Sequence, residues 1–227
     1  MTINYMPYAG GHSYQLSLPQ PCEGDAPGEI PLEGEIRRQP VFLRYLTVAG
    51  LWNFSVFTAG PFFNVHLAQN LGASARTIGL LAMVSALTSM AGQWAFGRWS
   101  DRFGAPRVMA WAGMLIPFLP WAWLLMRSPW HVIPINAAAG FLWAGFELCS
   151  LNTLLLLSPA ETLPRYAALY HLVVGGASAL GAAVGGWIAA AWGFEPLFVL
   201  SGLGRMAAMG FYGWRVFPRL VSNARAT

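Results

Sequence analysis

The sequence predicts an all-α membrane protein with six transmembrane helices. Of its 227 residues, 56% are hydrophobic and only 10% are charged, whereas about 25% of the residues of an average soluble domain are charged. The hydrophobic residues gather into long runs, and each run approaches the ~20 residues that cross the hydrocarbon core of a bilayer. A single soluble core could not bury so many long apolar segments.

The region before the first apolar run differs in composition from the rest of the chain. Residues 1–40 are rich in proline and glycine, show little apolar periodicity, and carry the acidic residues Glu23, Asp25, Glu29, Glu33 and Glu35. Such segments bury too little apolar surface to fold on their own. We therefore expect residues 1–40 to form a disordered cytoplasmic tail or linker, and we assign no site to them.

Residues 41–218 are expected to form a six-helix unit. The apolar runs predict spans over residues 46–67, 78–96, 108–126, 131–157, 166–192 and 197–214. The fourth and fifth spans are longer than the hydrocarbon core requires, and helices of that length can tilt or project from the bilayer. Residues 219–227 then form a short cytoplasmic tail.

The distribution of arginine predicts which ends of the spans face the cytoplasm, because short cytoplasmic loops accumulate Lys and Arg. With both termini inside, the outer loops contain only Arg76 and Arg127, and Arg205 falls within the last span. The remaining arginines are all on the inner side: Arg37, Arg38, Arg44, Arg98, Arg102, Arg107, Arg165, Arg215, Arg219 and Arg225. We therefore expect an N-in, C-in topology.

The connection between the second and third spans has a distinctive pattern. Residues 97–107 read GRWSDRFGAPR. Gly97 would allow two helices to approach closely, and Gly104 would allow the tight reversal that so short a loop needs. Asp101 could interact with a helix N-terminus, and Arg102 with a carboxylate or a lipid phosphate. A generic, positively charged inner loop with glycines is the alternative interpretation.

This segment resembles the G-x-x-x-D-R-x-G signature loop of the major facilitator superfamily, which lies on the cytoplasmic side after the second helix of a six-helix half. Of the basic residues that continue the family's pattern, this chain keeps Arg107. The resemblance covers residues 39–217 and implies one half of a bundle of that type. It also implies that Gly97, Asp101, Arg102, Gly104 and Arg107 act as a gating loop.

A complete member of that family contains two such halves, and this chain supplies one. The residues that approach the first span, RRQP at 37–40, resemble the linker into the second half. The first span itself, with WNF at 52–54 and GPF at 60–62, also resembles the second half more than the first. The resemblance therefore implies a C-terminal half that needs a partner, either a second copy or a separately encoded half.

The fifth span carries a further resemblance. Residues 181–186 read GAAVGG, which is similar to the G-P-x-x-G-G core of the family's antiporters, with Ala182 in place of the proline. Small residues also allow helices to pack closely. We favour close packing as the interpretation of this segment.

Polar residues inside a membrane span are costly, so each one is a candidate functional residue. Two spans carry polar stripes at helical spacing. The stripes consist of Asn53, Phe57, Gly60 and Asn64 in the first span, and of Asn136, Gly140, Trp143, Glu147 and Ser150 in the fourth. These two spans line the central cavity in the family that the chain resembles. The resemblance therefore implies substrate or coupling roles for Asn53, Asn64, Asn136, Glu147 and Arg205.

Glu147 and Arg205 lie at matching depths, each ~15 Å from the inner end of its span at 1.5 Å per residue. Arginine stays charged in proteins, so a buried Arg205 needs a partner, and Glu147 is the only carboxylate at that depth. Two hypotheses stay open: a static ion pair between the spans, or a role for Glu147 in the cavity. For His171, near the inner surface, we favour a hydrogen-bonded interface role over a proton relay.

The resemblance implies a multi-pass transporter of the cell (inner or plasma) membrane, moving a small solute by alternating access with a second half. The alternative hypotheses are a non-transporting assembly subunit and a truncated transporter fragment. The expected partners are the lipid bilayer, the second half and the small-molecule substrate, without nucleic acid. We expect no enzymatic activity, cofactor or metal site, because no histidine follows Ser178 as its base and the two cysteines lack metal-ligand spacing.

Overall fold

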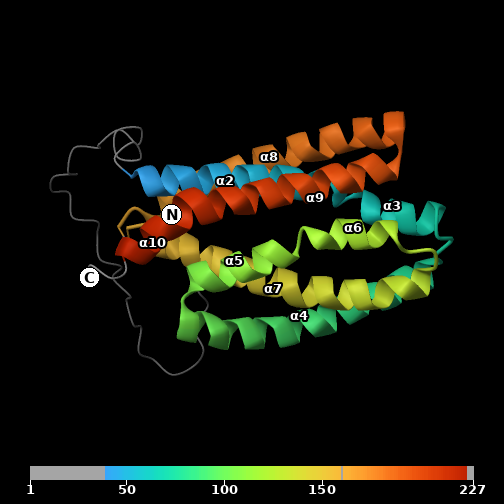
Figure 1. The fold of residues 1–227 in the computed structure, drawn as a ribbon, viewed down its shortest axis with the longest axis horizontal. Helices are drawn as coiled ribbons and strands as arrows, with labels where there is room; N and C mark the ends of the chain where they lie inside the picture. Colours follow the sequence, from blue (N-terminus) through green and yellow to red (C-terminus); the bar gives the residue numbers. More distant parts are fainter. Residues whose placement is uncertain (1–38, 160, 224–227) are drawn as a thin grey trace, which may run out of the picture.

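The structure of the protein is a computed structural model that describes residues 39–159 and 161–223. All regular secondary structure in these residues is helical, and the helices lie along one long axis (Figure 1). The expected tail over residues 1–40 lies outside the described residues except for its last two, and Pro40 already begins a helix. Residues 224–227 of the expected C-terminal tail also lie outside, while a helix continues to Asn223.

The described residues form six helical rods, which correspond in order to the six expected spans. Each rod begins a few residues before its predicted run, whereas the ends vary: the fourth and fifth rods end where the runs do, at Leu157 and Trp192, and the third ends earlier, at Leu124. The rods are α2 (Pro40–Ala59) with α3 (Phe62–Gln69); α4 (Ala75–Phe103); α5 (Ala105–Leu115) with α6 (Phe118–Leu124); η1 (Pro129–His131) with α7 (Val132–Leu157); α8 (Leu163–Trp192); and α9 (Phe194–Phe211) with η2 (Tyr212–Val216) and α10 (Phe217–Asn223).

Four of the rods are long and apolar enough to cross a bilayer, namely Pro40–Gln69, Ala75–Phe103, Pro129–Leu157 and Leu163–Trp192. The other two rods are not among these four, and both are interrupted, as the first rod also is between Ala59 and Phe62. α5 ends before Pro117, which cannot donate the backbone hydrogen bond that continues a helix. In the last rod a π-helical turn, Tyr212–Val216, separates α9 from α10. The expected count of six spans therefore requires these two interrupted rods to cross as well.

The segment that was expected to form a loop, residues 97–107, is almost entirely helical. α4 continues to Phe103 and α5 begins at Ala105, so Gly104 alone connects them. Its φ of 86° lies in a region that residues with a Cβ rarely adopt. The predicted loop is therefore wrong in extent, because the end of an apolar run does not mark the end of a helix.

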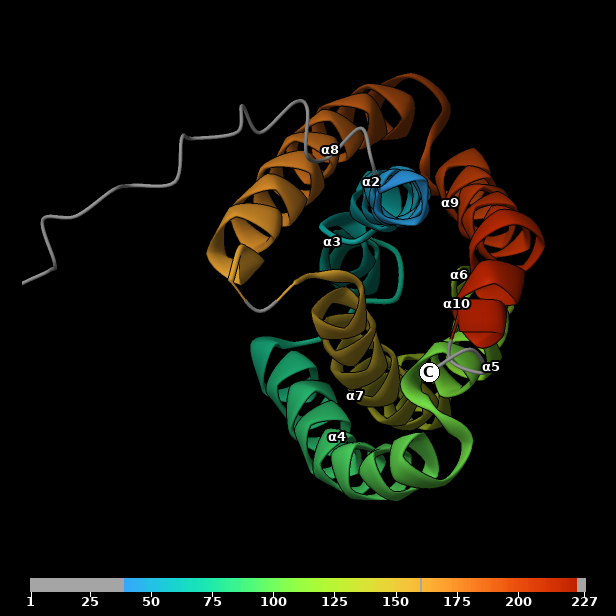
Figure 2. The ribbon, with the colours of Figure 1, turned by 90° about the vertical axis from the view of Figure 1, so that its left-hand side faces the viewer.

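The packing of the rods repeats within the bundle. α2 packs between α8 and α9, and α7 packs between α4 and α5 (Figure 2). If each of the first three rods is exchanged with the corresponding rod of the last three, the same pairs of rods are in contact. Between the two sets of three, α6 packs against α9. This is the pattern expected of a pair of three-helix repeats. It places α2 and α7 on the inside, with α4 and α8 beside them on one flank.

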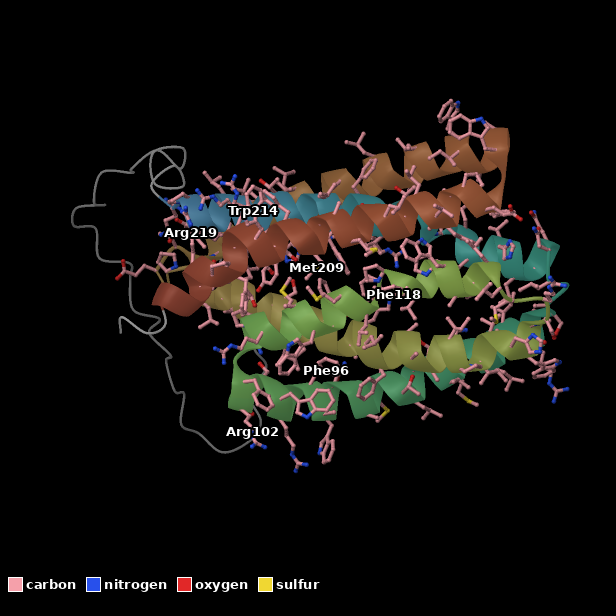
Figure 3. The ribbon with its side chains drawn as sticks, in the orientation of Figure 1. Phe96, Arg102, Phe118, Met209, Trp214 and Arg219 are labelled. Atoms are coloured by element: carbon pink, nitrogen blue, oxygen red, sulfur yellow. The ribbon has the colours of Figure 1, made fainter. Side chains whose placement is uncertain are left out.

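Glycines allow the closest of these contacts. A Cβ at Gly92 of α4 would collide with the backbone of Phe141 in α7, and one at Gly181 of α8 with the backbone of Phe54 in α2. Gly97, where close approach was expected, has only Leu148 near its position, at 4.0 Å. The close approach of α4 and α7 is therefore made about one and a half turns earlier in α4, and Phe96 points into the same contact (Figure 3).

Candidate functional site

Two pockets occur one after the other along α7. We call the first the arginine pocket; it has a volume of about 250 Å³ and is lined by Val56, Gly60, Phe63, Asn64, Leu119, Trp123, Asn136, Ala139, Trp143 and Arg205. We call the second the glutamate pocket; it has a volume of about 200 Å³ and is lined by Trp52, Asn53, Trp143, Phe146, Glu147, Ser150, Leu151, Leu154, Tyr170 and His171.

The five predicted substrate or coupling residues divide between these pockets. Asn64, Asn136 and Arg205 line the arginine pocket, whereas Asn53 and Glu147 line the glutamate pocket. Because the lining residues of α7 run from Asn136 to Leu154 at 1.5 Å per residue, the two pockets together extend over ~27 Å of that helix. The spacing of the polar stripes therefore identified wall residues of both pockets, but it did not show that there are two.

The arginine pocket has a buried cation in its wall. Arg205 is only 2% exposed. The α9 backbone around it is held against α2 by a hydrogen bond of 2.6 Å from the Ser201 hydroxyl to the Ser55 carbonyl oxygen. Gly204 fits against the side chain of Ser55, and Gly202 against the indole of Trp121. These small residues let α9 approach its neighbours, so the Arg205 side chain extends into the space between the rods.

Arg205 has no carboxylate partner among residues 39–159 and 161–223. Its Nε is buried without a hydrogen-bond partner, and its Cζ lies 5.8 Å from the ring centroid of Trp143, close enough for a cation–π contact. Glu147 lines the other pocket and is exposed. The hypothesis of a static ion pair between the two residues is therefore wrong in this structure, because residues at equal depth can point into different spaces.

Aromatic side chains separate the two pockets. The ring centroids of Trp52 and Trp143 are 5.9 Å apart, and those of Trp52 and Phe146 are 4.4 Å apart. Trp143 lines both pockets. This aromatic cluster of Trp52, Trp143 and Phe146 forms a wall between two polar compartments in an otherwise apolar bundle.

A hydrogen-bonded group lies at the edge of the glutamate pocket. The Tyr45 hydroxyl donates to the Ser150 carbonyl oxygen at 2.9 Å and lies 2.8 Å from the Ser150 hydroxyl. That hydroxyl lies 3.4 Å from the hydroxyl of Tyr170, which precedes His171 in α8. Sequence reasoning missed Tyr45, although a tyrosine inside a span needs a hydrogen-bond partner and is for that reason a signal.

Comparison with protein families decides the class of the protein. The family model described as Major Facilitator Superfamily matches residues 34–226. The chain belongs to the major facilitator superfamily. A comparison with curated proteins gave no match. As a member of this family, the chain is an integral, multi-pass membrane protein and a membrane transporter of the major facilitator type, with the lipid bilayer and a small solute as its partners.

The segment that resembles the superfamily's signature loop lies at the junction of α4 and α5. Gly97, Asp101 and Arg102 are on the last turns of α4, whereas Arg107 is on the first turn of α5. No side chain caps α5, so the contact expected between Asp101 and a helix N-terminus is not made there. Arg102 projects from the end of α4 (Figure 3), with its Cζ 5.3 Å from the ring centroid of Phe103. The junction is instead held by Tyr212.

Tyr212 links this junction to the last rod of the major facilitator bundle. Its hydroxyl donates to the Pro106 carbonyl oxygen at 3.1 Å, and its ring is fully buried. Tyr212 opens the π-helical turn of the last rod. The antiporter-like segment 181–186, in contrast, serves as packing surface, because Gly181 and Gly185 lie against the backbone of α2. This agrees with the interpretation that we favoured from the sequence.

Proposed function

We propose that this chain is one six-span half of a major facilitator transporter, the C-terminal one, and that it moves a small solute by alternating access with a second half. The observation that carries this proposal is the series of two polar pockets along α7, separated by the aromatic cluster. Polar groups inside spans are costly, so their presence there marks candidate pathways for substrates or ions. Asn53, Asn64, Asn136, Glu147 and Arg205 are the substrate or coupling residues in this proposal.

In the proposed topology, both termini lie in the cytoplasm, and the protein lies in the inner or plasma membrane of the cell. The distribution of arginine supports it, because the junction of α4 and α5 and the start of α8 lie at the arginine-rich end of the bundle. In this topology the glutamate pocket is nearer the cytoplasm and the arginine pocket nearer the outside. A solute would then pass the aromatic cluster when the site changes access.

The second half is proposed to dock beside α4 and α8. Only 11% and 17% of the apolar windows of these helices are buried, against 44% and 39% for the other two candidate spans. On α8, Gly175 and Gly176 have open space around them. Small residues at an open helix surface permit the close helix contacts that join bundles in membranes. The partner is a second copy of this chain or a separately encoded half.

The test of this proposal combines a mass measurement with transport. The purified chain is reconstituted in lipid vesicles, and uptake of labelled small solutes is measured beside the oligomeric mass in mild detergent. A dimeric mass with saturable uptake, abolished by Trp143→Arg in the wall between the pockets, is the expected result. A strict monomer without uptake of any solute would instead favour a non-transporting subunit or a transporter fragment.

A further inference from the structure

The arginine pocket contains a charge that the described chain does not neutralise. Arg205 is 2% exposed, and the Nε of its guanidinium has no hydrogen-bond partner. No carboxylate lies within ion-pair distance of it in residues 39–159 and 161–223. A guanidinium does not lose its proton in a protein. A buried cation in a membrane bundle needs a counter-charge, and the pocket that Arg205 lines is the space in which a ligand could supply it.

The other walls of the arginine pocket define what can supply that counter-charge. Asn64 and Asn136 bring carboxamides, which can donate hydrogen bonds to an oxyanion. Phe63, Trp123 and Trp143 bring apolar and aromatic surface. The guanidinium of Arg205 presents a planar fork of donors that matches a carboxylate in a bidentate arrangement. The pocket therefore combines a head-group site with a site for an apolar body.

Charge balance narrows the class of anion further. Among the residues that the structure describes, Arg205 is the only cationic side chain in the wall of this pocket. A single cation balances a single negative charge, whereas a phosphate dianion would leave one charge without a cationic partner in the wall of this pocket. A neutral solute would leave Arg205 itself uncompensated. A monoanion with two oxygens in one plane satisfies both the charge and the geometry.

We propose that the arginine pocket binds an organic monocarboxylate, whose carboxylate pairs with Arg205 while its apolar body packs between Phe63, Trp123 and Trp143. This names the substrate class at the proposed site and in that respect rests on the proposed function. The volume of about 250 Å³ suits a small molecule with a single ring or a short alkyl chain. Asn64 and Asn136 complete the hydrogen bonds of the carboxylate.

The experiment measures binding to the purified full chain in lipid nanodiscs by quenching of tryptophan fluorescence. The probes are benzoate and hexanoate, each with its neutral amide, together with phenylphosphonate. Wild-type protein is expected to bind at least one carboxylate saturably at millimolar concentrations, and to bind the amides and phenylphosphonate at least about tenfold more weakly. The bound carboxylate should also raise the melting temperature, because a ligand of the folded state stabilises it.

The variants assign the effect to one guanidinium. Arg205→Gln should weaken carboxylate binding at least about tenfold, and Arg205→Lys should recover part of it, because the charge returns without the planar fork. Arg215→Gln removes an exposed arginine of the same rod and should bind like wild type. Melting curves of all variants show that they are folded. Equal binding of amides and carboxylates, unchanged binding by folded Arg205→Gln, or no carboxylate binding at all would overturn the proposal.

Binding and transport separate the two proposals, because binding in nanodiscs requires neither a second half nor translocation. Carboxylate binding without uptake into vesicles would leave the monocarboxylate site in place and refute transport by two copies of this chain. Saturable uptake of a neutral solute that neither benzoate nor hexanoate inhibits would support the transport function and refute the monocarboxylate site. Phenylphosphonate binding more tightly than benzoate would also overturn the assignment to a monoanion.

Discussion

Arg205 shows what helical spacing can and cannot say about a single residue. Counting along the helices placed Arg205 and Glu147 at the same depth, and both line pockets in the structure. Counting residues gives the position of a side chain along the helix axis but not the direction in which it points from that axis. Direction depends on how α9 packs against α2 and α6, which is set by contacts such as Ser201 with Ser55. The ion pair was therefore one of two hypotheses that the sequence left open, and the structure has two separate pockets instead.

The first prediction concerns the stability cost of Arg205. Replacing this unpaired, buried cation with an apolar side chain, Arg205→Met, should raise the free energy of unfolding of the ligand-free protein. We expect an increase of at least about 1 kcal/mol, because replacing even a buried ion pair by apolar residues often stabilises a protein by that amount, and an unpaired cation lacks the compensating attraction. Thermal melting in mild detergent measures it, with the exposed Arg215→Met as control. A loss of stability in Arg205→Met would mean that Arg205 has a structural partner.

A second prediction tests whether Glu147 and Arg205 are independent. Because they line different pockets, the stability changes of Glu147→Gln and Arg205→Gln should add in the double variant to within about 0.3–0.5 kcal/mol. Glu147→Gln alone should change the unfolding free energy by less than about 0.5 kcal/mol, since its side chain is exposed. Recovery of stability in the double variant would restore the ion-pair hypothesis.

At the scale of whole elements, composition predicted the positions of the rods well but their ends poorly. All six apolar runs became helical rods. The segment 97–107 shows why the ends were missed: a bilayer limits the length of an apolar run, whereas backbone hydrogen bonds continue a helix into polar residues until a residue such as Gly104 stops it. The sequence also could not predict which glycines lie at helix–helix contacts, because that depends on how α4 is rotated about its own axis where it packs on α7.

The third prediction uses this difference between glycines. Gly92→Ala should destabilise the bundle by about 1–3 kcal/mol, because the added Cβ would meet the backbone of Phe141 and force α4 away from α7. Gly175→Ala adds the same methyl group at a position with open space and should leave the melting temperature unchanged or slightly raised. Melting curves of the two variants in the same detergent give the comparison. Equal effects would show that α4 and α7 do not pack through Gly92.

At the scale of the whole molecule, the arrangement of the rods brings distant segments into one site. The arginine pocket combines residues of α2, α3, α6, α7 and α9. The sequence could place Asn64, Asn136 and Trp143 on the stripes, but the aromatic wall that Trp123 supplies follows from packing between rods far apart in the chain. The family resemblance supplied the fold class, while the division into two pockets required the three-dimensional structure.

The fourth prediction tests the orientation of the bundle. Arg102 lies at the end of α4 and Arg127 between α6 and η1, at opposite ends of the rods, and both side chains are exposed. In a background without native cysteines, Arg102→Cys should react with an impermeant maleimide only after the cells are opened. Arg127→Cys should react in intact cells. Labelling of both from the same side would contradict a six-span, N-in, C-in topology.

The last prediction concerns assembly. If the second half docks beside α8, a bulky side chain at Gly176 should weaken assembly without harming the fold, because this residue has open space in the single chain and small residues govern helix approach in membranes. Gly176→Leu should therefore shift the detergent mass from dimer toward monomer and still melt in one cooperative transition, with a melting temperature lowered only by the loss of the partner. Gly210→Leu is the matched control, since Gly210 also has open space but lies on α9, away from the proposed interface.

If both variants keep the dimeric mass, the two copies meet elsewhere; if both dissociate, the change reflects general loss of contacts and not the α8 surface. Loss of assembly in Gly176→Leu alone, with vesicle uptake lost in parallel, would tie transport to the contact of two halves.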